Sequence, residues 1–192
     1  MLFIGWSCLD DCSQAQVVSD PVEWSVENYR DENVDSIPDC HILVKIVRDF
    51  NNDGIGDIAI SDTYDWGNAG GDWDIFLGTK NKQYKYLGDL GFHPDAIAFK
   101  PIEREASQIT VYIHTSAGGG DLIHYRLSSK GIREIKRKSL VLDNADDAKE
   151  FEKYDQLFAN VNKNPISVWC KLSDYLRDKN CRWQPGYFPI HH

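Results

Sequence analysis

The stretch HILVKIVRDFNNDGIGDIAISD, residues 41–62, places two short apolar runs on either side of a polar loop. The first run, 41–47, is rich in β-branched residues, and the second, 58–61, resumes the apolar pattern, so each favours a strand. Two such runs joined by a loop that contains Gly predict an antiparallel hairpin. The loop itself is crowded with short oxygen-bearing side chains. It is either a polar turn without a ligand or a cation site.

The oxygen-bearing residues fall at alternate positions, and a tight loop turns alternate residues toward one centre. Counted from the first aspartate, positions 1, 3, 5, 7 and 9 are Asp49, Asn51, Asp53, Ile55 (through its backbone carbonyl) and Asp57. Gly54 between them permits a sharp turn. Calcium takes about six to eight oxygens of these kinds, whereas magnesium gives up its water reluctantly. Because carboxylates this close repel one another without a cation, the sequence predicts a calcium site.

The flanks of the loop separate it from an EF-hand, which needs a bidentate Glu at position 12 and helices on both sides. Here position 12 is Ile60 and the flanks are strands. The order strand, D-x-[DN]-x-D-G-x-x-D, strand in VKIVRDFNNDGIGDIAISD resembles the calcium-binding hairpin of FG-GAP/VCBS-type repeats. Such repeats occur in integrin α-chain propellers and in many bacterial secreted proteins. The resemblance implies that the five loop residues ligate calcium. One copy of the loop is too few for a complete propeller.

Beyond the hairpin, the chain continues with alternating apolar runs separated by turn residues. They lie at 73–77, 83–90, 96–100, 108–114, 121–128 and 131–142. This pattern predicts a mainly β fold of antiparallel meander sheets, either propeller-blade-like or a sandwich. A stripe that includes Phe151, Tyr154 and Phe158 predicts a C-terminal helix at about 145–160, and Val168 with Leu172 allows a second short helix.

The expected organisation is an irregular lead-in at 1–40 and a β domain with the calcium loop at 41–142. A helical segment at 143–192 then packs on the β domain. The net charge is −9, and the first 78 residues carry 16 of the 30 acidic residues but three of the 21 basic ones. This balance disfavours nucleic acid as a ligand. One basic cluster, 126–138, fits the solvated face of a strand or a patch for an anionic partner.

The cysteines number five, and their spacing matches no zinc site. Pairing of Cys8 with Cys12 and of Cys170 with Cys181 is a hypothesis, which would suit an oxidising compartment. The N-terminus starts apolar but lacks an early Lys or Arg, so no signal peptide is convincing. We expect a periplasmic or secreted protein, and no apolar run is long enough to span a membrane.

The function expected from these features is non-enzymatic. Calcium would hold the hairpin rigid, and the neighbouring loops at 62–72 and 115–121 would bind a protein or a glycan. Asp65, Trp66 and Asp72 are the candidate partner-binding residues, because an aromatic ring and acids lie within a Gly-rich loop. The alternative is an immunity or inhibitor protein that neutralises a toxin or hydrolase by binding it. A third class, a hydrolase, would need a His or Asp outside the calcium loop to be essential.

Overall fold

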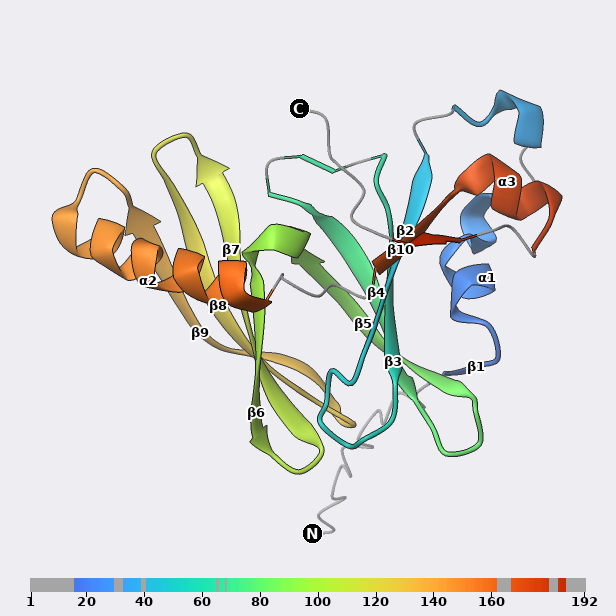
Figure 1. Ribbon diagram of the computed structural model, residues 1–192, viewed down its shortest axis with the longest axis horizontal. Coiled ribbons are helices and arrows are strands. Elements are labelled where there is room, and N and C mark those ends of the chain that lie inside the picture. The colour runs from blue at the N-terminus through green and yellow to red at the C-terminus, as the bar shows by residue number, and fades with distance from the viewer. Residues whose placement is uncertain are drawn as a thin grey trace, which may run out of the picture.

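Two antiparallel sheets pack face to face, and helices cover their outer faces (Figure 1). The computed structural model describes residues 16–29, 33–38, 41–64, 66–67, 69–161, 167–179 and 183–185. The fold is mainly β, and one of the sheets is curled like half a barrel. This confirms the predicted fold class of antiparallel meander sheets with a helix near the C-terminus.

The larger sheet has seven strands in the order β1-β5-β4-β3-β2-β10-β11. Their bounds are β1 Val17–Val18, β2 Ile42–Arg48, β3 Asp57–Asp62, β4 Gly71–Gly78, β5 Tyr84–Phe92, β10 Ser167–Lys171 and β11 Gln184–Pro185. The central hairpin pairs Leu43 with Asp62 and Arg48 with Asp57, which is the predicted hairpin around the acidic loop. β10 was not predicted. It pairs with β2, so Val168 lies on a strand and the short helix begins only at Leu172.

The smaller sheet is a meander of four strands in the order β6-β7-β8-β9. Their bounds are β6 Ile97–Glu103, β7 Ala106–Ser116, β8 Gly119–Ser128 and β9 Gly131–Val141. Inward side chains of both sheets form one shared core, in which Trp73 and Phe92 of the large sheet meet Val111 and Ile123 of the small sheet. Trp73 is fully buried. A core shared between two faces makes the molecule a sandwich.

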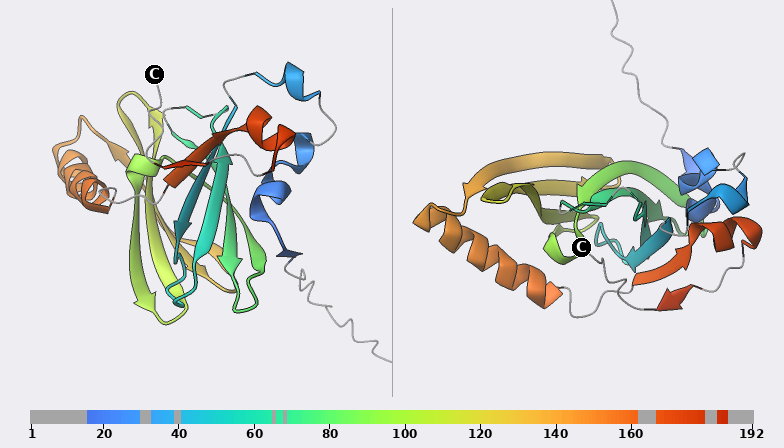
Figure 2. Two further views of the ribbon diagram at one scale, coloured as in Figure 1. Left: turned by 45° about the vertical axis from the view of Figure 1, so that its right-hand side comes forward. Right: turned by 90° about the horizontal axis from the view of Figure 1, so that it is seen from above.

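The outer faces are covered by helices on opposite sides of the molecule (Figure 2). The helices are α1 Pro21–Ser25, α2 Ala145–Val161 and α3 Leu172–Arg177, and the 3-10 turns are η1 Glu27–Tyr29, η2 Val34–Ser36 and η3 Pro94–Ala96. The segments around α1 and α3 cover the large sheet, so β3 is buried on both faces, with Ile58 and Ile60 facing the helices. Phe158 of α2 packs on Tyr112 of the small sheet.

Because neighbouring strands are antiparallel, the connections between them lie at two opposite ends of the sandwich. One end carries the acidic loop 49–56 and the β4–β5, β6–β7 and β8–β9 turns, at the bottom of Figure 1. We call it the acidic-loop end. The opposite end carries the 63–70 connection, η3 and the β7–β8 turn. Loops 62–72 and 115–121, which the sequence suggested as neighbours of the calcium loop, therefore lie at the far end, because one strand length separates them from it.

Candidate metal loop at one end of the sandwich

The acidic loop is curled by hydrogen bonds between its own side chains and backbone. The backbone N–H of Asp53 donates to Oδ1 of Asp49 at 3.1 Å and to Oδ1 of Asn51 at 3.0 Å. The N–H of Gly54 donates to Oδ2 of Asp49 at 2.8 Å, and the N–H of Ile55 donates to Oδ1 of Asp53 at 2.8 Å. Oxygens from positions 1 and 3 of the motif therefore converge on a single N–H.

Two residues of the loop adopt the left-handed backbone region. Gly54 has φ of 88°, which glycine adopts without steric cost, as position 6 of the motif requires. Asn52 has φ of 63°, a region in which Asn is tolerated better than most residues. Local sequence thus produces the curl directly, since the chain reverses at these two residues.

Asp57 plays a different part from the other acids of the loop. Its side chain is fully buried, and its Oδ2 accepts hydrogen bonds from the N–H groups of Phe50 at 2.7 Å and Asn51 at 3.3 Å. Its Oδ1 accepts from the N–H of Gly78 at 2.9 Å. A carboxylate has about four acceptor positions, so three are used and one on Oδ1 remains. Through these hydrogen bonds, Asp57 joins the end of the loop to its beginning and to the neighbouring strand β4.

Burial raises the pKa of Asp57 to about 7. Its hydrogen bonds with Gly78 and Phe50 act in the opposite direction, and the charge of Asp53 raises the pKa further. The main cause is the desolvation of this buried carboxylate. A divalent cation in the loop would favour the ionised form and reverse this shift.

The donor set suits a cation that accepts mixed oxygen ligands. Asp49 and Asp53 supply carboxylates, Asn51 an amide and Ile55 a backbone carbonyl, all within one loop. Nδ2 of Asn51 lies 2.9 Å from Oδ2 of Asp53, so these two side chains already meet. Among the described residues, no three His, Cys, Asp or Glu side chains gather as a ligand group. The loop offers two carboxylates, an amide and a carbonyl, together with the remaining acceptor position on Oδ1 of Asp57.

The loop is also joined to the small sheet. Nδ2 of Asn52 donates to the carbonyl of Glu103 at 3.4 Å, and the carbonyl of Asn52 accepts from the N–H of Glu105 at 3.3 Å. Phe50 is buried in the shared core with its ring 5.3 Å from that of Phe99. Sequence reasoning missed these roles. An apolar Phe within a polar loop was the only available signal, and nothing marked Asn52.

Trp66 and Asp72, two of the three residues expected to bind a partner, lie at the opposite end. Trp66 is half-buried, with its indole N–H donating to Oγ of Ser61 at 2.8 Å and its ring packed on Trp73. Asp72 is exposed on β4, and Asp65 lies outside the described residues. The structure therefore brings neither Trp66 nor Asp72 to the acidic loop.

A buried histidine–aspartate pair lies at this same far end. Nδ1 of His41 is 2.6 Å from Oδ2 of Asp62, which also accepts from the hydroxyl of Tyr29 at 3.1 Å. The ring of Tyr64 stacks on His41 at 4.1 Å and is itself half exposed. The pair resembles two members of a catalytic triad. However, the ring of Tyr64 covers the imidazole, so the geometry alone does not define a catalytic site.

The other histidines considered from the sequence, His114 and His124, do not form a pair. His124 is buried beneath α2, where its Nδ1 lies 2.9 Å from Oγ1 of Thr110 and 3.0 Å from Nε2 of Gln108. His114 instead packs edge-on against Tyr112. The imidazole of His124 thus lies between polar side chains of β7 and the ring of Tyr154 on α2.

In comparisons with known proteins, no family model, no curated protein and no solved structure matched this chain. Of the helices in the described residues, none has the length and apolarity needed to cross a membrane. Cys170 takes part in a disulfide. The other four cysteines lie outside the described residues, so the hypothesis on their pairing stays open.

Proposed function

We propose that this protein is a non-enzymatic calcium-binding β domain whose acidic-loop end binds a protein or glycan partner. The observation that carries the proposal is the curl of the 49–57 loop, in which the side-chain oxygens of Asp49, Asn51 and Asp53 are gathered by shared backbone donors. The likeness of this loop to FG-GAP/VCBS-type hairpins supports the same ion. Bound calcium would supply positive charge to the crowded acids and hold the curl.

Calcium bound in the acidic loop would also restrict the motion of the neighbouring turns. Asn52 bonds to the β6–β7 turn, and Asp57 bonds to Gly78 at the start of the β4–β5 turn. A rigid group of turns is a good binding surface, because less conformational entropy is lost on association. In this proposal, calcium prepares the surface and the surrounding turns make the contacts.

A second candidate function, an immunity or inhibitor protein, is favoured by the far end of the sandwich. Tyr64 is 54% exposed there and is held in place by its stack on His41. Tyrosine that is both exposed and rigid is the kind of residue that dominates protein interfaces. Such a ring, with Trp66 on the same connection and Asp72 at the start of β4, would suit insertion into an enzyme active site.

The proposed location is periplasmic or extracellular. A disulfide at Cys170 persists in oxidising compartments and is rare in the cytosol. Calcium is also available to weak sites outside the cell.

The test is thermal unfolding of the full chain, stripped with a chelator and then titrated with calcium or magnesium. We expect calcium to raise Tm and magnesium to raise it less. The variant Asp53→Asn keeps the acceptor for Ile55 but removes one charge, so it should weaken calcium binding at least tenfold. Asp72→Asn, an exposed acid outside the loop, is the matched control and should bind calcium as the parent protein does. Equal Tm with calcium and with chelator would overturn the proposal.

A further inference from the structure

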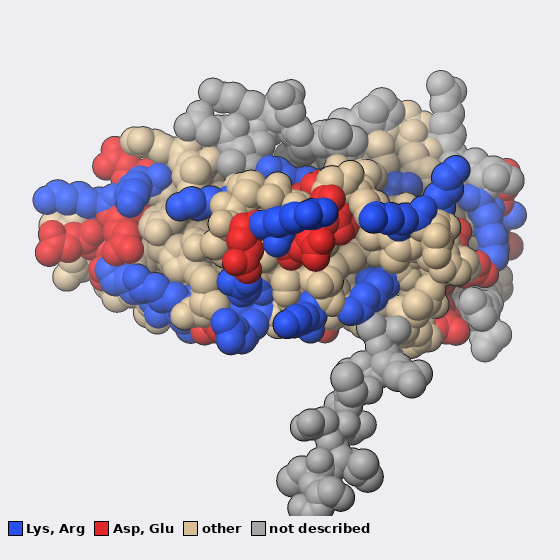
Figure 3. Space-filling view, turned by 90° about the horizontal axis from the view of Figure 1, so that it is seen from below, with Lys and Arg blue, Asp and Glu red and all other residues tan. Residues whose placement is uncertain are grey.

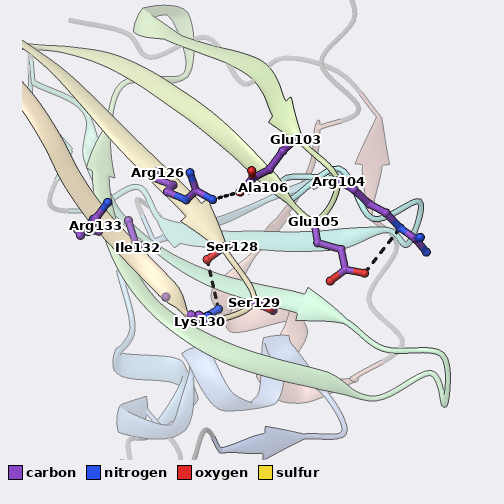
Figure 4. Close-up of a pocket in the computed structure, with 11 residues that line it drawn as sticks. Glu103, Arg104, Glu105, Ala106, Arg126, Ser128, Ser129, Lys130, Ile132 and Arg133 are labelled. Carbon is purple, nitrogen blue, oxygen red and sulfur yellow. Dashed lines mark hydrogen bonds and ion pairs between the residues drawn. The ribbon is translucent and has the colours of Figure 1, made fainter.

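A pocket of about 450 Å³ opens between the β6–β7 and β8–β9 turns at the acidic-loop end (Figure 4). We call it the turn pocket. It is lined by Glu103, Arg104, Glu105, Ala106, Arg126, Ser128, Ser129, Lys130, Gly131, Ile132 and Arg133. Four cations and two acids therefore surround this space, although the chain as a whole has a net charge of −9. The end view in Figure 3 shows Lys and Arg side chains spread around a compact group of acids.

The two acids of the turn pocket leave part of its positive charge uncompensated. Glu103 pairs with Arg126, and Glu105 lies 3.8 Å from the largely exposed Arg104. Lys130 and Arg133 form no ion pair with any described residue. Positive charge thus remains on two neighbouring elements, the β8–β9 turn and the first part of β9.

The pairing of β8 with β9 adds a second observation. Arg126 stands directly opposite Arg133 in the antiparallel register. Side chains directly opposite project from the same face, and like charges at such positions destabilise a sheet. Only Arg126 has an acid to offset this repulsion, so an anion between the two guanidinium groups would relieve it. Arginine is well suited to this role, because its planar fork matches the oxygens of phosphate, sulfate and carboxylate.

The β8–β9 turn is held in a fixed position. The N–H of Lys130 donates to Oγ of Ser128 at 3.3 Å, and Gly131 takes φ of 138°, a value that side chains rarely allow. From the large sheet, Nζ of Lys85 donates to the carbonyl of Ser129 at 2.5 Å. Lys85 therefore braces the turn and adds a further positive charge beside the pocket.

The turn pocket is also connected to the acidic loop. The two hydrogen bonds of Asn52, with Glu103 and Glu105, fix the β6–β7 wall of the pocket. Calcium in the loop would hold this wall and would also reduce the repulsion between the loop acids and an incoming anion. Both effects act in the same direction, so calcium and the anion should each strengthen the binding of the other.

We propose that the turn pocket binds a tetrahedral oxyanion, a sulfate or phosphate ester, through Arg126, Lys130 and Arg133, and that calcium in the 49–57 loop strengthens this binding. The coupling rests on the proposed calcium function, whereas the pocket does not. The proposal names the chemical class of partner that the acidic-loop end would take: a sulfated or phosphorylated group.

The test uses four small probes with one ring in common: phenyl sulfate, phenyl phosphate, benzoate and the neutral benzyl alcohol. Each is titrated by calorimetry into the full chain at constant ionic strength, with calcium and with chelator. Backbone amide shifts at Ser129, Lys130 and Gly131 locate the binding. We expect the two esters to bind more tightly than benzoate, and benzyl alcohol not to bind. The tighter of the two esters identifies a sulfated or a phosphorylated partner.

Two variants distinguish binding in the turn pocket from nonspecific attraction to positive charge on the protein surface. The double variant Lys130→Gln with Arg133→Gln should weaken ester binding at least about tenfold. Lys136→Gln, an exposed cation on the same strand outside the pocket, is the control and should change affinity less than about twofold. Without ligand, Arg133→Gln should unfold at the same or a higher temperature than the parent, because it removes the like-charge pair. If Lys136→Gln weakens ester binding as much as the double variant does, the proposed binding in the turn pocket is wrong. It is also wrong if the double variant binds the esters as tightly as the parent protein.

The calcium coupling has its own readout. Calcium should tighten ester binding, and Asn52→Gly, which keeps the positive φ and the backbone carbonyl, should reduce this gain. If the esters bind equally with and without calcium while calcium itself binds, the coupling is wrong and the pocket stands. If calcium does not bind but the esters do, the proposed calcium function fails instead. If calcium binds and no ester does, the turn pocket is refuted alone.

Discussion

Oδ1 of Asp57 accepts a hydrogen bond from the backbone N–H of Gly78 at 2.9 Å, across 21 residues of chain. This bond ties the acidic loop to the end of β4. The other oxygen of Asp57 accepts from the N–H groups of Phe50 and Asn51. One buried carboxylate therefore satisfies three backbone donors, and the position of the loop relative to the large sheet depends on it.

Replacing this carboxylate should destabilise the whole domain. Asp57→Ala leaves three buried N–H groups without their acceptor, and each such group costs about 1–3 kcal/mol. We expect the free energy of unfolding in urea to fall by about 3 kcal/mol or more. Asp72→Ala, at an exposed position near the start of β4, should change it by less than about 0.5 kcal/mol. A loss for Asp57→Ala no larger than for this control would contradict the role of Asp57 as a structural acceptor.

Gly78 and Gly54 should respond differently to alanine. A Cβ at Gly78 would lie 2.2 Å from the carbonyl oxygen of Gly56, a contact with backbone that cannot be relieved by a side-chain rotation. A Cβ at Gly54 meets nothing, and only the positive φ is unfavourable. Gly54→Ala should therefore cost about 1 kcal/mol. Gly78→Ala should cost at least twice as much and should displace the loop. Equal losses in thermal or urea unfolding would argue against the close approach.

The effect of calcium on stability should depend on pH through Asp57. Its carboxyl has an ordinary pKa near 4 in the unfolded chain, and burial raises the pKa to about 7 in the folded protein. Without calcium, the folded state binds this proton more readily than the unfolded state, so this group lowers stability as pH rises from about 4 to about 7. Calcium would favour the ionised carboxylate of Asp57 and would therefore remove this loss of stability.

The measurement is the difference in Tm between calcium-loaded and chelator-treated protein at two pH values. We expect a larger gain at pH 8 than at pH 5, because the proton competes with calcium at the lower pH. The difference cancels the contribution of groups that calcium does not affect. A gain that is equal at both values, or larger at pH 5, would contradict this linkage.

His124 should make the packing of α2 sensitive to acid. Burial lowers the pKa of His124, the charge of Lys136 lowers it further, and Glu150 acts in the opposite direction. A lowered folded pKa means that the unfolded chain binds the proton more readily. The contribution of neutral His124 is therefore complete above its ordinary pKa of about 6.5 and is lost as pH falls below it.

Urea unfolding at pH 7.5 and pH 5.5 tests this sensitivity. We expect His124→Gln to reduce the loss of stability between the two values, because the variant has no proton to gain. His114→Gln is the matched control, since His114 is exposed at the end of the same face, and should keep the slope of the parent protein. A slope unchanged in His124→Gln would show that the acid sensitivity arises elsewhere.

Much of the fold could be predicted from local pattern. Alternation of apolar residues gave the eight strands from β2 to β9 within a few residues, and the stripe through Phe151, Tyr154 and Phe158 gave α2. The strand β10 was missed because Val168 and Leu172 fit a helical spacing. Local periodicity carries no information on which strand pairs with the free edge of β2, and in the fold this is Ser167–Lys171.

The candidate site likewise has a part that local sequence predicts and a part that depends on the tertiary structure. The spacing of Asp49, Asn51 and Asp53 around Gly54 is a local property, since side chains two residues apart determine the curl by themselves. Sequence placed Asp57 in the same ligand set. Only the assembled sheet shows that its carboxylate also holds Gly78.

By itself, the sequence determined the meander, the acidic hairpin loop and the curl of its side chains, because each depends on interactions between residues close in the chain. Only the tertiary structure decided which loops share an end. The number and direction of strands place the 62–72 connection one strand length from the acidic loop and bring Asn52 to Glu103. The opposition of Arg126 and Arg133 is likewise a matter of strand register. Contacts between distant residues arise from packing two sheets around one core, and local spacing does not specify them.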